Sequence, residues 1–179
     1  MFNNLVIGTV AFALVQQTSG QRLKPVTDPD AYAIYATLLP SIWRKRSDEL
    51  ILLVQETATD SCRVSRLPKG WDGVQEDFNR QNRTARALQP VLPLGDYRLI
   101  SRADIQADDA RLEQEYPGIW QRRPGSMEFA AVSAVGFNAA KTKALVYIRL
   151  RSSGQIHLME RRDGQWVASR GGVRCGWGA

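Results

Sequence analysis

The chain has 179 residues, of which 44% are hydrophobic and 23% are charged, and its formal net charge is +6. This length is typical of one domain, and this composition argues against a disordered, a repeat and a polytopic membrane protein. The charge excess lies entirely in residues 141–179, which hold eight Lys and Arg against two Asp and Glu. We therefore expect a local region of positive potential that favours anionic partners.

The first twenty residues predict export. They contain no charged side chain and carry an apolar run from Leu5 to Val15. This run is shorter than the roughly 20 apolar residues of a membrane-spanning helix, and the small residues at 18–20 suit a signal-peptidase site. We expect residues 1–20 to be a signal peptide and residues 21–179 to form a single periplasmic or extracellular domain. A short amphipathic anchor or a wrongly assigned start codon is the alternative.

The two cysteines, Cys62 and Cys175, are candidates for a disulfide, because an even number in an exported chain permits pairing. In the chain-entropy model, a bridge that closes so long a loop stabilises the fold by about 4–5 kcal/mol. Neither cysteine has a His or Cys at ligand spacing, so we expect no metal site and no cofactor.

The first elements after the leader are a helix and a buried strand. Asp28 is placed as the N-cap and Pro29 as the first helical residue. Pro40 predicts that the helix ends or kinks at Leu39. The apolar run 50–54 then predicts a central strand that is covered on both faces. The buried face of the helix follows from apolar residues at helical spacing, namely Ala31, Ile34, Tyr35, Leu38 and Ile42.

The middle of the chain predicts a second helix, a short strand and a short third helix. Apolar spacing extends the second helix from Asp72 to Leu88, before a proline. Three arginines on it, Arg80, Arg83 and Arg86, are three residues apart and form a stripe. The stripe could contact phosphates. Glu76 and Asp77 lie one turn earlier and offset its positive charge, so we favour a solvated helix face. The short strand is expected at 97–101 and the third helix at 108–116.

The last third predicts an antiparallel meander with strands at 129–138, 143–151, 155–161 and 165–169. A three-residue loop at 152–154 would place Leu150 opposite Ile156 and Arg149 opposite His157, which keeps the apolar rows together. The side chains alternate along the strands. The outward row of this register contains Tyr147, Arg149, Arg151, His157 and Arg161.

This outward row is the candidate binding site of the chain. Several cations and one aromatic ring on a flat strand surface can bind carboxylate, phosphate or an acidic protein edge. We therefore consider an anionic protein, glycan or lipid surface in the envelope as the partner, with a plain solvated basic surface as the alternative. Nucleic acid is disfavoured, because export is expected and residues 21–140 carry no net charge.

Four short motifs carry a resemblance to known proteins. They are Val135-Gly136-Phe137-Asn138, Thr142-Lys143-Ala144-Leu145-Val146-Tyr147, Gly154 and Asp163-Gly164-Gln165-Trp166. Together they resemble the C-terminal part of a group of uncharacterised exported bacterial proteins, which implies a bacterial secreted protein and no particular activity. The meander that ends in Asp-Gly-Gln-Trp is also similar to the last strands of cone-shaped, nuclear-transport-factor-2-like domains.

Motifs of catalysis are missing from the sequence. There is no Gly-x-Ser-x-Gly elbow and no glycine-rich phosphate loop, and His157 is the only histidine. The acidic residues from Asp108 to Glu115 could act as an acid and base pair or bind Ca²⁺, but acidic residues at a helix start are also expected from the helix dipole. The members of this cluster are Asp104, Asp108, Asp109, Glu113 and Glu115.

We predict one α+β domain. Two main helices and a short third helix pack on one face of an antiparallel sheet of about five or six strands. The expected function is non-catalytic binding of an anionic partner through the basic strand face. The alternatives are a small secreted hydrolase that uses the cluster from Asp108 to Glu115, and a cone-shaped domain with a pocket for a small ligand.

Overall fold

The structure is a computed structural model that describes residues 23–43, 51–60, 67–92, 97–115, 129–150, 153–169 and 173–175. The expected signal peptide, Cys62 and Arg151 lie outside these residues, as does the side chain of Cys175. The Cys62–Cys175 bridge therefore stays a prediction. Within the described ranges, no helix is both long enough and apolar enough to cross a membrane.

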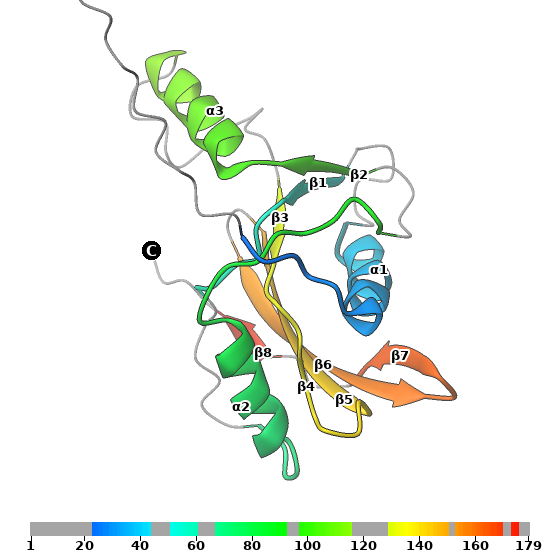
Figure 1. Cartoon of the computed structure of the whole chain (residues 1–179). Coiled ribbons are helices and arrows are strands. Elements are labelled where there is room, and N and C mark those ends of the chain that lie inside the picture. The colour runs from blue at the N-terminus through cyan, green and yellow to red at the C-terminus, as the bar shows by residue number, and fades with distance from the viewer. Residues whose placement is uncertain are drawn as a thin grey trace, which may run out of the picture.

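Three helices and eight strands make up the described chain (Figure 1). In chain order they are α1 (Pro29–Trp43), β1 (Ile51–Val54), α2 (Asp72–Gln81), β2 (Tyr97–Ile100), α3 (Arg102–Glu115), β3 (Ala130–Val132), β4 (Gly136–Phe137), β5 (Lys143–Leu150), β6 (Gly154–Arg162), β7 (Gln165–Ala168) and β8 (Val173–Cys175).

All eight strands belong to one sheet with the order β2-β1-β3-β5-β6-β7, to which β4 is added beside β5 and β8 beside β6. The α+β class and the C-terminal meander β5–β6–β7 are confirmed. The prediction of a purely antiparallel sheet is wrong, because β1 runs parallel to both β2 and β3. The reason lies in the connections: α2 joins β1 to β2 and α3 joins β2 to β3, and crossovers through a helix are typical of parallel strands.

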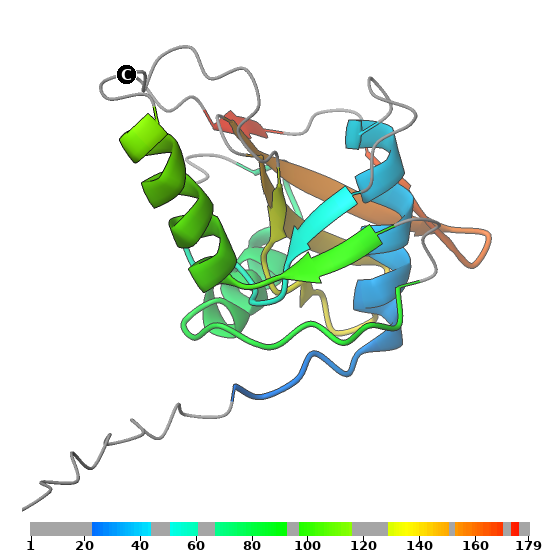
Figure 2. The ribbon, with the colours of Figure 1, turned by 90° about the horizontal axis from the view of Figure 1, so that it is seen from above.

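The helices cover both faces of the sheet, which corrects the expectation of a single covered face. On one face, α1 packs Ile34 and Tyr35 in the same buried cluster as Val146. On the other face, α2 packs Phe78 in a cluster with Tyr147. Figures 1 and 2 show α1 on one side of the sheet, α2 on the other and α3 far from α1. Two layers are needed because β5 buries side chains on both faces from residue 144 to residue 148.

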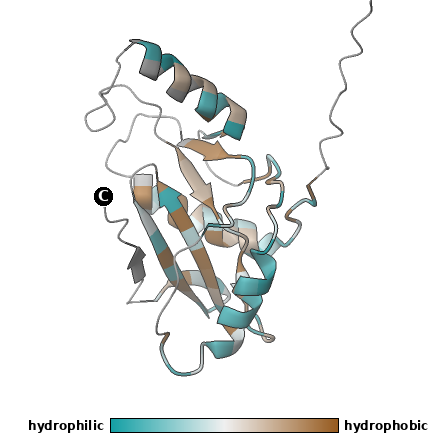
Figure 3. Cartoon of the chain, turned by 90° about the vertical axis from the view of Figure 1, so that its left-hand side faces the viewer, coloured by the Kyte–Doolittle hydropathy of each residue, from teal (hydrophilic) through white to brown (hydrophobic). Residues whose placement is uncertain are grey.

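Hydropathy follows this layering. In Figure 3, brown runs along much of the central strands, whereas α2 is mainly teal. Val74 and Phe78 are the buried residues of α2. The exposed remainder of the helix is polar, as expected for a helix that covers a sheet from the solvent side.

The start of α1 is confirmed, and of the two outcomes predicted at Leu39, an end or a kink, the end is wrong. The Asp28 side chain accepts a hydrogen bond from the backbone N–H of Asp30 at 3.0 Å, and Pro29 is the first helical residue. The helix continues through Pro40 to Trp43. Pro40 is exposed, so water can bond the carbonyl group that its missing N–H leaves free.

Three further predictions about element ends are wrong. The second helix ends at Gln81 instead of Leu88, and the strand expected over 129–138 is split into β3 and β4. These two breaks release residues that line the cavity described below. The third helix begins at Arg102 instead of Asp108, because Ser101 and Asp104 cap it there, and its 14 residues make it longer than α2.

The register of the β5–β6 hairpin also differs from the prediction. Tyr147 lies opposite Ile156 and Arg149 lies opposite Gly154, and the backbone N–H of Leu150 donates to the carbonyl of Ser153 at 2.7 Å. The Tyr147 ring packs on Gly154 so closely that a Cβ atom at this position would overlap the ring. The glycine therefore selects this register, because it provides space for the tyrosine.

Candidate functional site

The strand residues predicted as one basic face lie on two faces. Tyr147 and Arg149 belong to the side covered by α2, whereas His157 pairs with Val146 and lies on the side covered by α1 with Arg161. The prediction of a shared outer face is wrong, because the observed register moves each β6 residue to the other face relative to β5. Tyr147 is fully buried and His157 is 9% exposed, so neither forms an outer surface.

The described arginines of this group have acidic neighbours. Arg149 forms an ion pair with Asp60. Arg161 lies over the Trp166 ring, and its Nη1 atom is 3.6 Å from an Oδ1 atom of Asp30. The Trp166 indole N–H donates to the same carboxylate at 3.0 Å, and this hydrogen bond is the main reason why the pKa of Asp30 is lowered. These contacts fix β7 to the start of α1.

The acidic cluster is engaged in helix capping where it is described. Asp104 accepts hydrogen bonds from the backbone N–H and the hydroxyl of Ser101, both at 2.8 Å, and these bonds lower the pKa of Asp104. Its own backbone N–H donates to the Ser101 hydroxyl, which completes a capping box. No group of three metal-ligating side chains occurs among the described residues. The side chains of Asp108, Asp109, Glu113 and Glu115 lie outside them.

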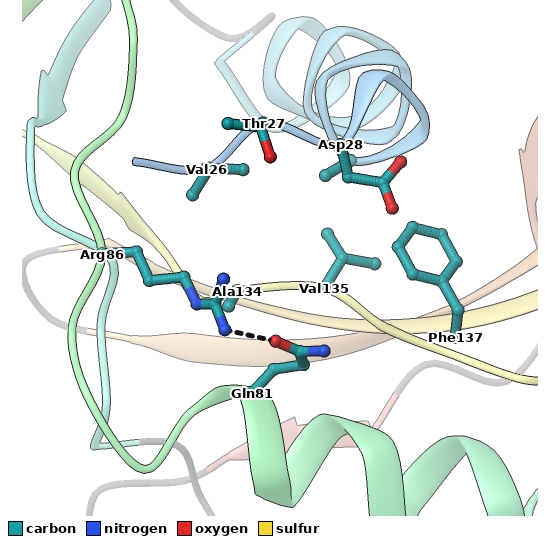
Figure 4. Close-up of a pocket in the computed structure, with 9 residues that line it drawn as sticks. Val26, Thr27, Asp28, Gln81, Arg86, Ala134, Val135 and Phe137 are labelled. Carbon is teal, nitrogen blue, oxygen red and sulfur yellow. Dashed lines mark hydrogen bonds between the residues drawn. The ribbon is translucent and has the colours of Figure 1, made fainter. Parts of the chain in front are cut away.

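A cavity of about 210 Å³ lies where the start of α1 approaches the end of α2 (Figure 4). The break between β3 and β4 forms its floor. The lining side chains come from these three places and from the segment after α2, and they are Val26, Thr27, Asp28, Ala31, Gln81, Arg86, Ala134, Val135 and Phe137.

Arg86 is held at the cavity by hydrogen bonds of its backbone. Its N–H donates to the hydroxyl of Thr57 at 2.9 Å, and its carbonyl accepts the N–H of Thr57 at 2.8 Å. The next residue, Ala87, donates to the carbonyl of Lys24 and accepts from Val26. The segment is thus bonded between the chain before α1 and the end of β1. Thr57 is fully buried, so this attachment is shielded from water.

The guanidinium of Arg86 points into the space between Thr27 and Gln81 (Figure 4). Its Nη2 atom donates to the Gln81 side-chain oxygen at 2.6 Å, and the Gln81 side-chain nitrogen donates to Asp77 at 3.3 Å. Gln81 therefore orients the guanidinium. The Nε atom of Arg86 is buried, and none of the described groups accepts a hydrogen bond from it.

The positive charge of Arg86 has no ion-pair partner in the described part of the chain. Asp28 also lines the cavity, but its carboxylate caps α1 and accepts a hydrogen bond from Lys141 at 2.8 Å. Lys141 is held in turn by Asp30 at 3.4 Å, and the bond to Asp28 is the main reason why the pKa of Lys141 is raised. The charge of Asp28 is thus balanced, and that of Arg86 is not.

The floor of the cavity is apolar and anchored from below. The side chain of Asn82 donates to the carbonyl of Ala134 at 2.9 Å and accepts the N–H of Ala134 at 2.8 Å. These two hydrogen bonds fix the break between β3 and β4 on the end of α2. Val135 and Phe137 follow and turn their side chains toward the cavity (Figure 4).

Sequence reasoning considered Arg86 only as part of a helical stripe. The stripe does not form, because α2 ends at Gln81 and carries only Arg80 of the three arginines. A signal was present in Asn82, because asparagine is favoured at the ends of helices. Nothing local points to Thr57, which is 29 residues from Arg86 in the chain.

The fold and the cavity define an α+β domain in which one mixed sheet lies between helices and an arginine projects into a cavity at a strand break. No protein-family model, no curated protein and no solved structure matches the chain.

Proposed function

We propose that this protein is a non-catalytic binding protein that recognises the anionic group of its partner through Arg86 in the cavity between α1 and α2. The observation that supports this function is the guanidinium with a buried Nε atom and no ion-pair partner among the described residues. Partial burial of a charge without a counter-ion costs free energy, and arginine keeps its proton at any physiological pH. An anion on the guanidinium would recover that cost through charge-assisted hydrogen bonds.

The positive C-terminal region supports the same function in a second way. Arg149, Arg161 and Arg162 each lie beside a carboxylate, so they are poor primary contacts for a partner. The excess charge of residues 141–179 still attracts anions at long range and raises their local concentration. We therefore infer that these residues steer the partner and that Arg86 binds it. We place this function in the envelope or outside the cell, because the leader favours export.

The test is a titration of ¹⁵N-labelled protein with acetate and with inorganic phosphate at low ionic strength, followed at the Nε–Hε signal of Arg86 and, in every variant, at the backbone amide signals of Val135 and Phe137. We expect saturable shifts with at least one anion. The variant Arg86→Gln should lose the binding at least about tenfold, which corresponds to one charge-assisted hydrogen bond.

The matched control is Arg83→Gln, which removes the same charge from an exposed side chain three residues away. It should bind as the unmodified protein does. Equal losses in both variants would show that only net charge matters, and unchanged binding in Arg86→Gln would remove Arg86 from the site.

A further inference from the structure

The size of the cavity limits what can bind beside Arg86. A water molecule occupies about 30 Å³ in the liquid, so a cavity of about 210 Å³ accommodates roughly seven non-hydrogen atoms. Pockets for nucleotides and other drug-sized ligands are larger, at about 300–1,000 Å³. The cavity therefore fits a small molecule or the end of a larger one.

The charges around the cavity favour a single negative charge on the ligand. Arg86 contributes a positive charge that no described carboxylate balances, so a single negative charge on the ligand is sufficient to balance it. The planar guanidinium also matches a planar carboxylate, with which it can form two parallel hydrogen bonds. These features favour a carboxylate over a phosphate dianion.

Part of the remaining wall is suited to hydrocarbon, whereas Gln81 and Thr27 add polar side chains. Val26, Ala134 and Val135 are buried and present no side-chain polar atom, and Phe137 adds an aromatic ring. Hydrocarbon of a ligand that packs on this part of the wall leaves water, which favours binding. The polar Thr27 is exposed and belongs to the rim.

We propose, on the basis of the function above, that the cavity binds a carboxylate carried on a short aliphatic group of about four carbons. Such a group occurs in a free branched-chain acid and in a C-terminal valine or leucine of a peptide. Both sources offer the same chemistry to Arg86 and to the apolar wall.

The experiment uses the full-length ¹⁵N-labelled protein and follows the Arg86 Nε–Hε signal. The probes are isovalerate, its neutral amide, inorganic phosphate, and the peptide Gly-Gly-Gly-Val with a free or an amidated C-terminus. We expect isovalerate or the free peptide to bind at least about tenfold more tightly than phosphate, with no binding of either amide. If isovalerate binds more tightly, the ligand is a free acid, and if the free peptide binds more tightly, the ligand is the C-terminus of a peptide.

A second variant tests the apolar wall separately from the charge. Val135→Leu adds one carbon toward the cavity and keeps Arg86. We expect isovalerate to lose about tenfold in affinity, because overfilling a packed site is costly, while acetate changes less than about twofold. Followed at the backbone amides of Val135 and Phe137, Arg86→Gln should weaken the binding of isovalerate and of acetate at least about tenfold, and Arg83→Gln should change neither.

The outcomes separate this inference from the proposed function. If phosphate shifts Arg86 and neither carboxylate does, the aliphatic carboxylate is wrong and anion recognition stands. If Val135→Leu affects isovalerate and acetate equally, the hydrocarbon does not occupy the cavity and the inference fails. If no anion shifts the Arg86 signal, the proposed function fails as well.

Discussion

His157 and Arg86 show two ways in which a protein accommodates a partly or fully buried basic side chain. His157 is 9% exposed, its Nε2 atom has no hydrogen-bond partner among the described groups, and burial lowers its pKa to about 4. It is therefore neutral at pH 7, which is the less costly state in an apolar core. Arginine cannot adopt this solution, because its guanidinium stays protonated. A retained arginine beside a cavity is consequently a stronger indication of a ligand than the buried histidine.

The histidine makes stability depend on pH. The folded pKa of about 4 is below the unfolded value near 6.5, so the unfolded chain binds more protons between these two values. The contribution of neutral His157 to the free energy of unfolding should be fully present above pH 6.5 and should decrease as the pH falls toward 4. At pH 4.5 the loss due to this residue is on the order of 2–3 kcal/mol.

Urea unfolding of the protein and of His157→Leu at pH 7.0 and pH 4.5 measures this loss. Between pH 7.0 and pH 4.5, the free energy of unfolding should decrease more for the unmodified protein than for the variant, which has no histidine at this position. A constant difference at both pH values would mean that His157 has the same pKa in the folded and the unfolded protein, as expected for a solvated side chain.

At the scale of elements, the close approach of β4 to α2 positions the floor of the cavity. Gly136 lies directly on the backbone of Phe78, and the backbone N–H of Phe137 donates to Asp77 at 2.8 Å. The split of the expected long strand into β3 and β4 thus follows from a contact with the helix. The same contact brings Val135 and Phe137 to the cavity.

Two glycine substitutions test this packing. A Cβ atom at Gly136 would overlap the backbone of Phe78, which cannot move as a side chain can, so Gly136→Ala should lower the free energy of unfolding by about 2–3 kcal/mol. Gly73→Ala in α2 meets no atom within 4 Å and should raise it by about 0.4–1 kcal/mol. Urea unfolding measures both. Equal effects of the two substitutions would contradict the close approach.

At the scale of the whole molecule, the cavity lies on the seam between two helical layers. The α1 cluster and the α2 cluster cover opposite faces of the sheet, and the lining combines the start of α1 with the end of α2. The seam is where side chains of both layers are incompletely packed against each other. A binding site at this position uses a gap in the fold instead of an added loop.

The unbalanced charge should cost stability in the unliganded protein. Arg86→Met keeps the hydrocarbon stem and removes the charge, and we expect thermal unfolding and urea unfolding to show equal stability or a gain of up to about 1–2 kcal/mol. The variant should lose anion binding at the same time. A loss of more than about 1 kcal/mol would instead identify Arg86 as a structural residue.

The elements predicted correctly from the sequence depend on neighbours a few residues apart. The cap at Asp28, the buried face of α1 and the strands of the meander follow from local hydrogen bonding and from the period of apolar residues. The α+β class follows from these elements together. None of these features requires knowledge of a distant contact.

Contacts between residues distant in the chain decided the rest. The helices cover both faces because β5 is buried on both, and the hairpin register follows from the space that Gly154 leaves for Tyr147. The site depends on Thr57, which holds Arg86 from 29 residues away. Sequence patterns describe each element alone, whereas the position of Arg86 is a property of three segments that meet only in the folded chain.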